Sequence, residues 1–248
     1  MPRAAAQDTQ PTRREKLVHY SLYYENFKNK NYKSARSDLL WILEHAPGLP
    51  EGDARNYRRA VKLYEGLAKR ATSKQKRKAY LDTAATYLAT APKKMNRQGI
   101  EYAPYAWQLR KGRFLARHQQ QSFSDVEGLK TSIAHYRNAF ELSPRKVNPY
   151  YIQRVLQAYL EENKLQKALK FARTVEKKRG YDKAVAKIVS RVREQVFGKN
   201  PQARIAYLER QAKAHPDSTR LLTELFNAYA ERGNVQKASK LAERLMKA

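Results

Sequence analysis

The chain has 248 residues, and its 51 Lys and Arg against 23 Asp and Glu give a formal net charge of +28 at pH 7, which points to anionic partners. Hydrophobic residues at 42% and 17 Tyr exclude a disordered basic tail and predict a folded core. The low counts of 9 Gly and 10 Pro favour helices over sheets. The lack of Cys excludes disulfides, thiol catalysis and thiolate metal sites.

The N-terminal residues lack both an apolar run and a helical period. We therefore expect residues 1–15 to form a flexible segment and residues 16–248 to form one helical domain. Nowhere does the chain contain the run of about 18 apolar residues that a membrane-spanning helix requires. We expect a cytoplasmic protein; the alternative is a periplasmic or exported one, if Ala4, Ala5 and Ala6 are the remnant of a signal peptide removed before Gln7.

Apolar residues recur every three or four positions from Lys16 onward, which is the period of an α-helix. One apolar face covers residues 17–27 and a second covers residues 32–42. A polar turn lies between them at residues 28–31, and Pro47 with Gly48 ends the second helix. The pattern predicts a helical hairpin.

Further hairpins follow along the chain. Two with longer turns are predicted at residues 54–91 and 104–143, the second stretched by an insertion near residues 119–124. Residues 149–159 pair with 165–175, a degenerate unit spans 182–215, and residues 219–230 pair with 235–246. The sequence therefore predicts an all-α protein of about six hairpins.

The last hairpin carries the most specific signature. Its key positions are Leu222, Leu225, Tyr229, Gly233, Ala238 and Leu245, and this spacing resembles that of tetratricopeptide repeats. The matching small residue of the 149–175 hairpin is Ala168, which lies 70 residues, or two periods of 35, before Ala238. The resemblance implies a right-handed superhelical solenoid of antiparallel hairpins, with both alanines buried where helices cross.

The resemblance also implies that the first helix of each hairpin lines a concave groove. That face would be aromatic and rich in amides, which suits an extended peptide held by stacking and backbone hydrogen bonds. The predicted peptide-groove residues are Tyr20, Tyr24, Phe27, Tyr150, Gln153, Gln157, Arg220 and Asn227.

Cations gather in stripes and clusters, with few acids among them. Because the second helices would form the outer surface, we expect these stripes to lie mostly on the convex side, where they can contact phosphates or remain a solvated surface. The predicted basic-surface residues are Arg55, Arg59, Lys62, Lys69, Arg70, Lys74, Lys76, Arg77, Lys78, Lys164, Lys167, Lys170, Arg173 and Lys177. Arg110, Arg113 and Arg117 alternate with aromatic residues, of which we expect Trp107 and Phe114 to belong to the core.

Catalytic signatures are missing from the sequence. The five His are dispersed and the Gly are isolated, so we expect no enzyme, no metal and no cofactor. The primary hypothesis is a scaffold that binds another protein or a peptide, preferably an acidic one. The alternative is an RNA- or ribosome-associated protein that uses the basic face, and a further alternative is a repeat scaffold whose positive charge was engineered.

Overall fold

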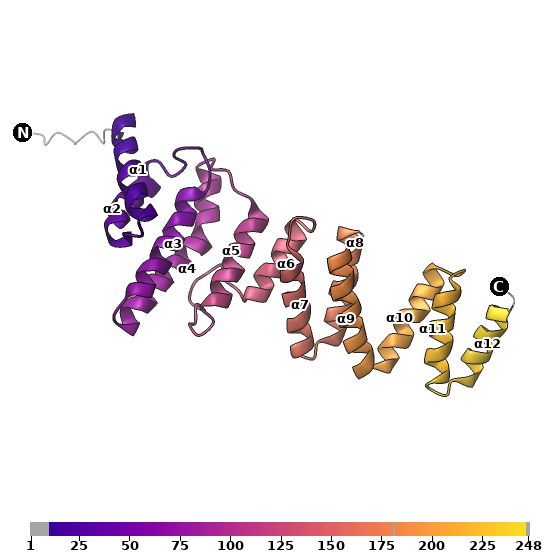
Figure 1. The fold of residues 1–248 in the computed structure, drawn as a ribbon. Helices are drawn as coiled ribbons and strands as arrows, with labels where there is room; N and C mark the ends of the chain where they lie inside the picture. The colour runs from indigo at the N-terminus through magenta and orange to yellow at the C-terminus, as the bar shows by residue number, and fades with distance from the viewer. Residues whose placement is uncertain (1–9, 181, 247–248) are drawn as a thin grey trace, which may run out of the picture. The chain divides into compact units, whose positions relative to one another are not determined.

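The computed structural model describes residues 10–180 and 182–246. Residues 1–9, including the alanines of the predicted signal-peptide remnant, lie outside the described residues. Twelve helices occur in the described part of the chain (Figure 1). They are α1 (Arg13–Lys28), α2 (Tyr32–His45), α3 (Arg55–Arg70), α4 (Lys74–Arg97), α5 (Pro104–Arg117), α6 (Ser132–Leu142), α7 (Pro149–Glu161), α8 (Leu165–Arg179), α9 (Lys183–Lys199), α10 (Pro201–Ala214), α11 (Thr219–Ala230) and α12 (Val235–Met246).

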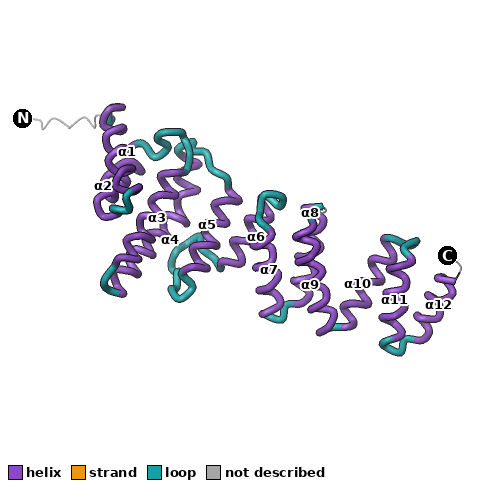
Figure 2. The backbone as a smooth tube through the Cα atoms, in the orientation of Figure 1, coloured by secondary structure: helices purple, strands orange, loops and turns teal. Residues whose placement is uncertain are grey.

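Consecutive helices pack as antiparallel pairs, from α1 with α2 to α11 with α12 (Figure 1). Most connections are short turns, and the described residues contain no sheet (Figure 2). The predicted all-α fold of six hairpins is confirmed. The right-handed sense of the stack stays a prediction.

The chain divides into two compact units between Ser143 and Pro144, with α1–α6 in the first unit and α7–α12 in the second. None of the helices in the described ranges is long and apolar enough to cross a membrane.

Helix α1 begins three residues earlier than expected. The hydroxyl of Thr12 accepts a hydrogen bond from the backbone N–H of Glu15, and the Glu15 carboxylate accepts one from the Thr12 N–H. This reciprocal capping box satisfies two donors at the start of the helix. Residues 13–15 are therefore helical.

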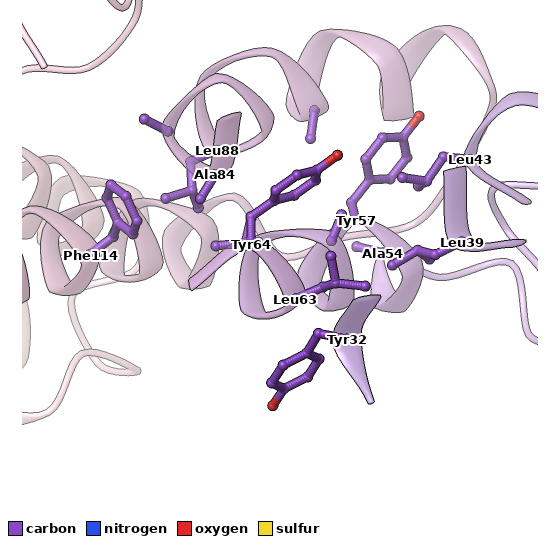
Figure 3. Packing of buried hydrophobic residues seen from close by; sticks show 14 of the residues in the cluster. Tyr32, Leu39, Leu43, Ala54, Tyr57, Leu63, Tyr64, Ala84, Leu88 and Phe114 are labelled. Carbon is purple, nitrogen blue, oxygen red and sulfur yellow. The ribbon is translucent and has the colours of Figure 1, made fainter. Parts of the chain in front are cut away.

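The core of the first unit is built from apolar faces of α2, α3, α4 and α5. Figure 3 shows Leu39 of α2, Tyr57 and Tyr64 of α3, and Leu88 of α4, which all belong to one buried cluster. Phe114 of α5 is 2% exposed and belongs to the same cluster. Trp107 is also buried, so the expectation that both aromatic residues are core residues is confirmed.

Two glycines allow close helix contacts in this unit. A Cβ added to Gly66 of α3 would lie 2.1 Å from Cε2 of Tyr32 in α2. A Cβ added to Gly112 of α5 would lie 2.4 Å from Cε1 of Tyr136 in α6. At both places the tyrosine ring occupies the space of the missing side chain.

Helix α4 extends beyond residue 91, where the sequence predicted its end, and runs through Pro92 to Arg97. Proline has no N–H to donate to the carbonyl of Leu88 one turn earlier. The indole Nε1–H of Trp107 donates to that carbonyl instead, at 2.9 Å. The helix continues because α5 supplies the missing donor.

The predicted insertion forms the loop between α5 and α6 (Figure 2). Its anchors are two buried polar side chains. Lys111 Nζ donates to the carbonyl of Gly128 at 3.1 Å, and the ring of His135 accepts from the backbone N–H of Lys130 at 3.0 Å.

In the second unit, α7–α12 bury the same kind of apolar faces. Ala168 of α8 is fully buried and Ala238 of α12 is 8% exposed, which confirms that both predicted small residues are buried. Tyr229 packs in the same cluster as Ala238, together with Leu222 and Leu225.

Candidate functional site

The first helices of the three hairpins in the first unit, α1, α3 and α5, line a pocket of about 640 Å³. Its lining residues are Phe27, Arg55, Arg58, Arg59, Val61, Lys62, Glu65, Arg110, Arg113, Phe114 and Arg117. Seven of these carry a positive charge and one is an acid. This balance favours an anionic ligand.

Arg59 is held rigidly in the pocket wall. Its Nη1 donates to the hydroxyl of Tyr23 at 2.7 Å and to that of Tyr20 at 3.2 Å, and its guanidinium lies 4.7 Å from the ring centre of Tyr24. The Tyr23 hydroxyl in turn donates to Asn56. Because these contacts fix the guanidinium, it is already oriented before a ligand arrives.

Asn56 links this network to the backbone. The side chain is buried, and its Nδ2 donates to the carbonyls of Pro47 at 3.0 Å and Leu49 at 2.6 Å. Burial raises the pKa of Tyr23, so the hydroxyl stays neutral despite the neighbouring guanidinium. The loop before α3 therefore fixes the position of Arg59 on α3.

The three aromatic residues predicted on α1 lie close to cations of α3. Tyr20, Tyr24 and Phe27 are partly buried and surround Arg59, and Lys62 Nζ lies 5.7 Å from the ring centre of Phe27. A ring that faces a cation in this way is attracted to it electrostatically. These rings contact the protein's own cations, and their predicted role in peptide binding stays a prediction.

Arg55 and Arg58 are balanced by acids at the start of α3. Arg55 pairs with Glu51 and with Asp53, and Arg58 Nη2 lies 3.3 Å from Asp53 Oδ2. At the other side of the pocket, Glu65 of α3 accepts from Arg117 at 2.5 Å and contacts His118 at 2.9 Å.

Although burial alone would raise the pKa of Glu65, the hydrogen bond from His118 and the charge of Arg117 lower it below its ordinary value. Glu65 therefore remains ionised and links α3 to the end of α5.

Arg110 has the least favourable surroundings in the pocket. Its guanidinium lies 5.8 Å from the ring centre of Trp107, and its Nε is buried and has no hydrogen-bond partner in the structure as described. Burial, with the nearby charges of Arg113 and Arg58, lowers the pKa of Arg110 to about 10. A buried donor without an acceptor costs folding free energy, and the Arg110 Nε is such a donor.

Four lining cations have no carboxylate within 4.0 Å among residues 10–180 and 182–246: Arg59, Lys62, Arg110 and Arg113. Arg113 is exposed, and its Nε donates weakly to the carbonyl of Leu109 at 3.3 Å. The pocket thus combines a rigid guanidinium, a half-buried one whose Nε has no acceptor, and an accessible one.

Arg55, Arg59 and Lys62 were predicted on the convex basic surface. In the structure these three residues line the pocket together with residues of α5, because α3 is the first helix of its hairpin. Arg70 is also engaged, since its Nη1 donates to the carbonyl of Lys30 at 2.8 Å. The exposed members of the α3–α4 cluster are Lys69, Arg70, Lys74, Lys76, Arg77 and Lys78.

The predicted residues of the second unit lie on its surface. On α8, Lys167, Lys170 and Lys177 are exposed, as is Lys164 just before it, whereas Arg173 is partly buried and burial lowers its pKa. The predicted groove residues Tyr150, which is 57% exposed, Gln153 and Gln157 lie on α7, and Arg220 and Asn227 are exposed on α11.

The sequence prediction did not assign Arg58, Glu65, Arg110, Arg113 and Arg117 to one site. They come from two helices about 50 positions apart in the chain. The sequence does carry a pattern that predicts the pocket. Basic residues recur at helical spacing on the first helices of two successive hairpins, as Arg55, Arg58 and Lys62 and as Arg110, Arg113 and Arg117. First helices of successive hairpins lie beside one another in a repeat stack.

These features place the chain in the class of all-α proteins built from helical hairpins. No family model and no curated protein matches the sequence. Among solved structures, the chain is similar to a tetratricopeptide repeat protein from Parabacteroides merdae, with 11% identity and a TM-score of 0.44 over 94% of this chain and 80% of that one.

Proposed function

We propose that this protein is a non-catalytic helical-repeat scaffold that binds an acidic segment of another protein in the arginine-lined pocket of its first unit. The observation that carries the proposal is the convergence of seven cations from α3 and α5, with a single acid among the lining residues. Guanidinium groups bind carboxylates through paired hydrogen bonds, and an extended segment would present several carboxylates to the pocket.

The contacts of three of the four histidines in the first unit fit a binding role. His19 Nδ1 lies 2.7 Å from Asp38, His118 contacts Glu65, and His135 contacts Gln108 at 2.6 Å. In these contacts the histidines link neighbouring helices, and none is paired with a hydroxyl nucleophile as acyl-transfer chemistry requires.

Fluorescence anisotropy with a labelled peptide of Glu and Gly tests the proposal. The pocket variant Arg110→Gln/Arg113→Gln removes two of the unpaired guanidinium groups. Its matched control, Lys93→Gln/Lys94→Gln, removes the same charge from exposed positions of α4 outside the pocket lining. We expect the pocket variant to bind about tenfold more weakly than the parent protein and the control to stay within about twofold, because paired charge-assisted hydrogen bonds are lost only in the pocket.

Equal weakening in the two variants would mean that the peptide responds to net charge alone, and the proposal would then be wrong. Circular dichroism of each variant checks that its helices are intact.

A further inference from the structure

Building on the proposed function, we infer that the bound segment carries a phosphate monoester, which the Arg110 and Arg113 side of the pocket recognises together with Arg59 and Lys62. The partner is thus a phosphorylated acidic segment of another protein. Four features of the pocket carry this inference. They are the cations without a carboxylate partner, the Arg110 Nε without an acceptor, the fixed guanidinium of Arg59, and the aromatic rings that face the pocket's own cations.

A ligand with a single carboxylate would not balance the positive charge of the pocket. Arg55, Arg58 and Arg117 already have carboxylate partners, but Arg59, Lys62, Arg110 and Arg113 have none among the residues the structure covers. A phosphate monoester carries about 1.5 to 2 negative charges at pH 7 and three acceptor oxygens, whereas a carboxylate carries one charge and two oxygens. A phosphate therefore neutralises more of this excess within the same small volume.

The donors also suit a phosphate. Six of the seven lining cations are arginines, whose planar groups bind two phosphate oxygens at once. The buried Nε of Arg110 is a donor with no acceptor, and burial next to Arg113 and Arg58 makes its charge unfavourable. A dianion at this place supplies both the acceptor and the opposite charge.

Arg59 adds a rigid element to the wall. The Tyr23 and Tyr20 hydroxyls and the ring of Tyr24 hold its guanidinium, so little conformational entropy is lost when it binds an oxygen. Arg113, exposed and weakly bonded, is the side chain that is free to close on the ligand.

The same geometry disfavours single-stranded RNA as the occupant. RNA-binding surfaces of this kind stack bases on free aromatic rings. Here Tyr20, Tyr24 and Phe27 face the cations Arg59 and Lys62, and Phe114 is buried in the core. The cations also converge from two helices onto one pocket, which fits a compact anion better than a continuous backbone.

The test compares one acidic peptide containing serine with the same peptide phosphorylated on that serine. Affinities are measured by anisotropy for the parent protein, the pocket variant Arg110→Gln/Arg113→Gln and the control Lys93→Gln/Lys94→Gln. We expect phosphorylation to raise affinity about tenfold or more in the parent and the control, and by less than about twofold in the pocket variant. Arg113→Gln alone, at an exposed position, is the second variant if the double change disturbs folding, and it should lose most of the gain.

A gain below about twofold in the parent, or the same gain in all variants, overturns the inference. If the unphosphorylated peptide still binds in a pocket-dependent way, the proposed function survives that result; if neither peptide does, both fall. Displacement of the phosphopeptide by tripolyphosphate or by single-stranded RNA at lower concentration than by unlabelled phosphopeptide also overturns it, in favour of a free polyphosphate or a nucleic acid.

Discussion

The surroundings of Arg110 make its charge destabilising for the folded protein. Its charge is partly buried among other cations, and its Nε lacks an acceptor. Replacing an uncompensated buried charge by an apolar group of similar size is often stabilising. The residue therefore fits a ligand-binding role better than a structural one.

Arg110→Met should raise the free energy of unfolding by about 1 kcal/mol, because the side chain keeps its packing on Trp107 and loses its desolvated charge. Urea denaturation of the parent and the variant measures this change. Arg55→Met is the contrasting variant, since Arg55 is paired with Glu51 and Asp53 and should gain nothing. A clear loss of stability in Arg110→Met would show that the guanidinium supports the fold.

His135 gives the first unit a pH dependence. The ring is 2% exposed, its Nε2 accepts from the N–H of Lys130, and burial, with the charges of Lys111 and Lys130, lowers its pKa to about 4. In the unfolded chain the ring is protonated below about pH 6.5, whereas in the folded chain it stays neutral down to about pH 4. Its contribution to stability is thus complete above about pH 6.5 and is lost as the pH falls toward 4.

His135→Gln should remove this dependence, since the amide keeps an acceptor and does not titrate. The difference between the pKa values of 6.5 and about 4 corresponds to roughly 3 kcal/mol. Between pH 7 and pH 4 we expect the parent to lose about that much more stability than the variant, as measured by urea denaturation at each pH. Parallel pH profiles for the two proteins would contradict the assignment.

At the scale of helices, Gly66 and Gly112 allow two helices to approach closely, because a tyrosine ring fills the space that a side chain at each position would need. Gly66→Ala should destabilise the protein by about 1 to 3 kcal/mol, because the new methyl group overlaps the ring of Tyr32, which is itself buried. The measurement is the urea midpoint at constant slope.

Gly198→Ala is the control, because Gly198 lies in α9 with nothing within 4 Å of the added Cβ. Alanine is the better helix former, so this variant should be more stable by about 0.5 kcal/mol. If both substitutions stabilise the protein, the close contact at Gly66 is not a limit on packing.

The hairpins were predictable because their apolar periods are local and clear, and because polar turns and prolines separate them. The run of α4 through Pro92 was not, since it depends on a donor from Trp107, fifteen positions later. The early start of α1 was predictable in principle, as Thr12 and Glu15 have the spacing of a capping box.

The pocket could not be predicted from local sequence patterns in the way the hairpins could. The sequence identifies the cations of α3, but the repeat resemblance only predicts that the basic stripes lie mostly on the convex side, and α3 is the first helix of its hairpin. Side-chain pairing decides which cations are free, and pairs such as Arg117 with Glu65 join residues 52 positions apart. Such pairing cannot be derived from local spacing.

For the whole molecule, the formal charge of +28 far exceeds what the pocket needs. Exposed lysines near and on α8, such as Lys164, Lys167 and Lys170, carry part of it. A surface of this kind attracts any polyanion at low salt, whether or not the polyanion is the partner. Variants that remove cations either from the pocket or from the exposed surface are therefore needed to separate specific binding of an anion from general electrostatic binding.

Single-stranded RNA provides that separation. Its log affinity should fall with log salt by about 0.7 per neutralised phosphate, so the slope counts the cations in contact. Replacing Lys164, Lys167, Lys170 and Lys177 by Gln removes exposed charge from α8 and its start, and glutamine is well tolerated in helices. We expect this variant to flatten the salt slope more than Arg110→Gln/Arg113→Gln does, because the exposed α8 stripe can follow a continuous phosphate backbone whereas the pocket cations converge on one place. If the pocket variant flattens the slope more, RNA occupies the pocket, and the basic residues of α3 and α5 form a nucleic-acid site in place of the proposed protein-binding one.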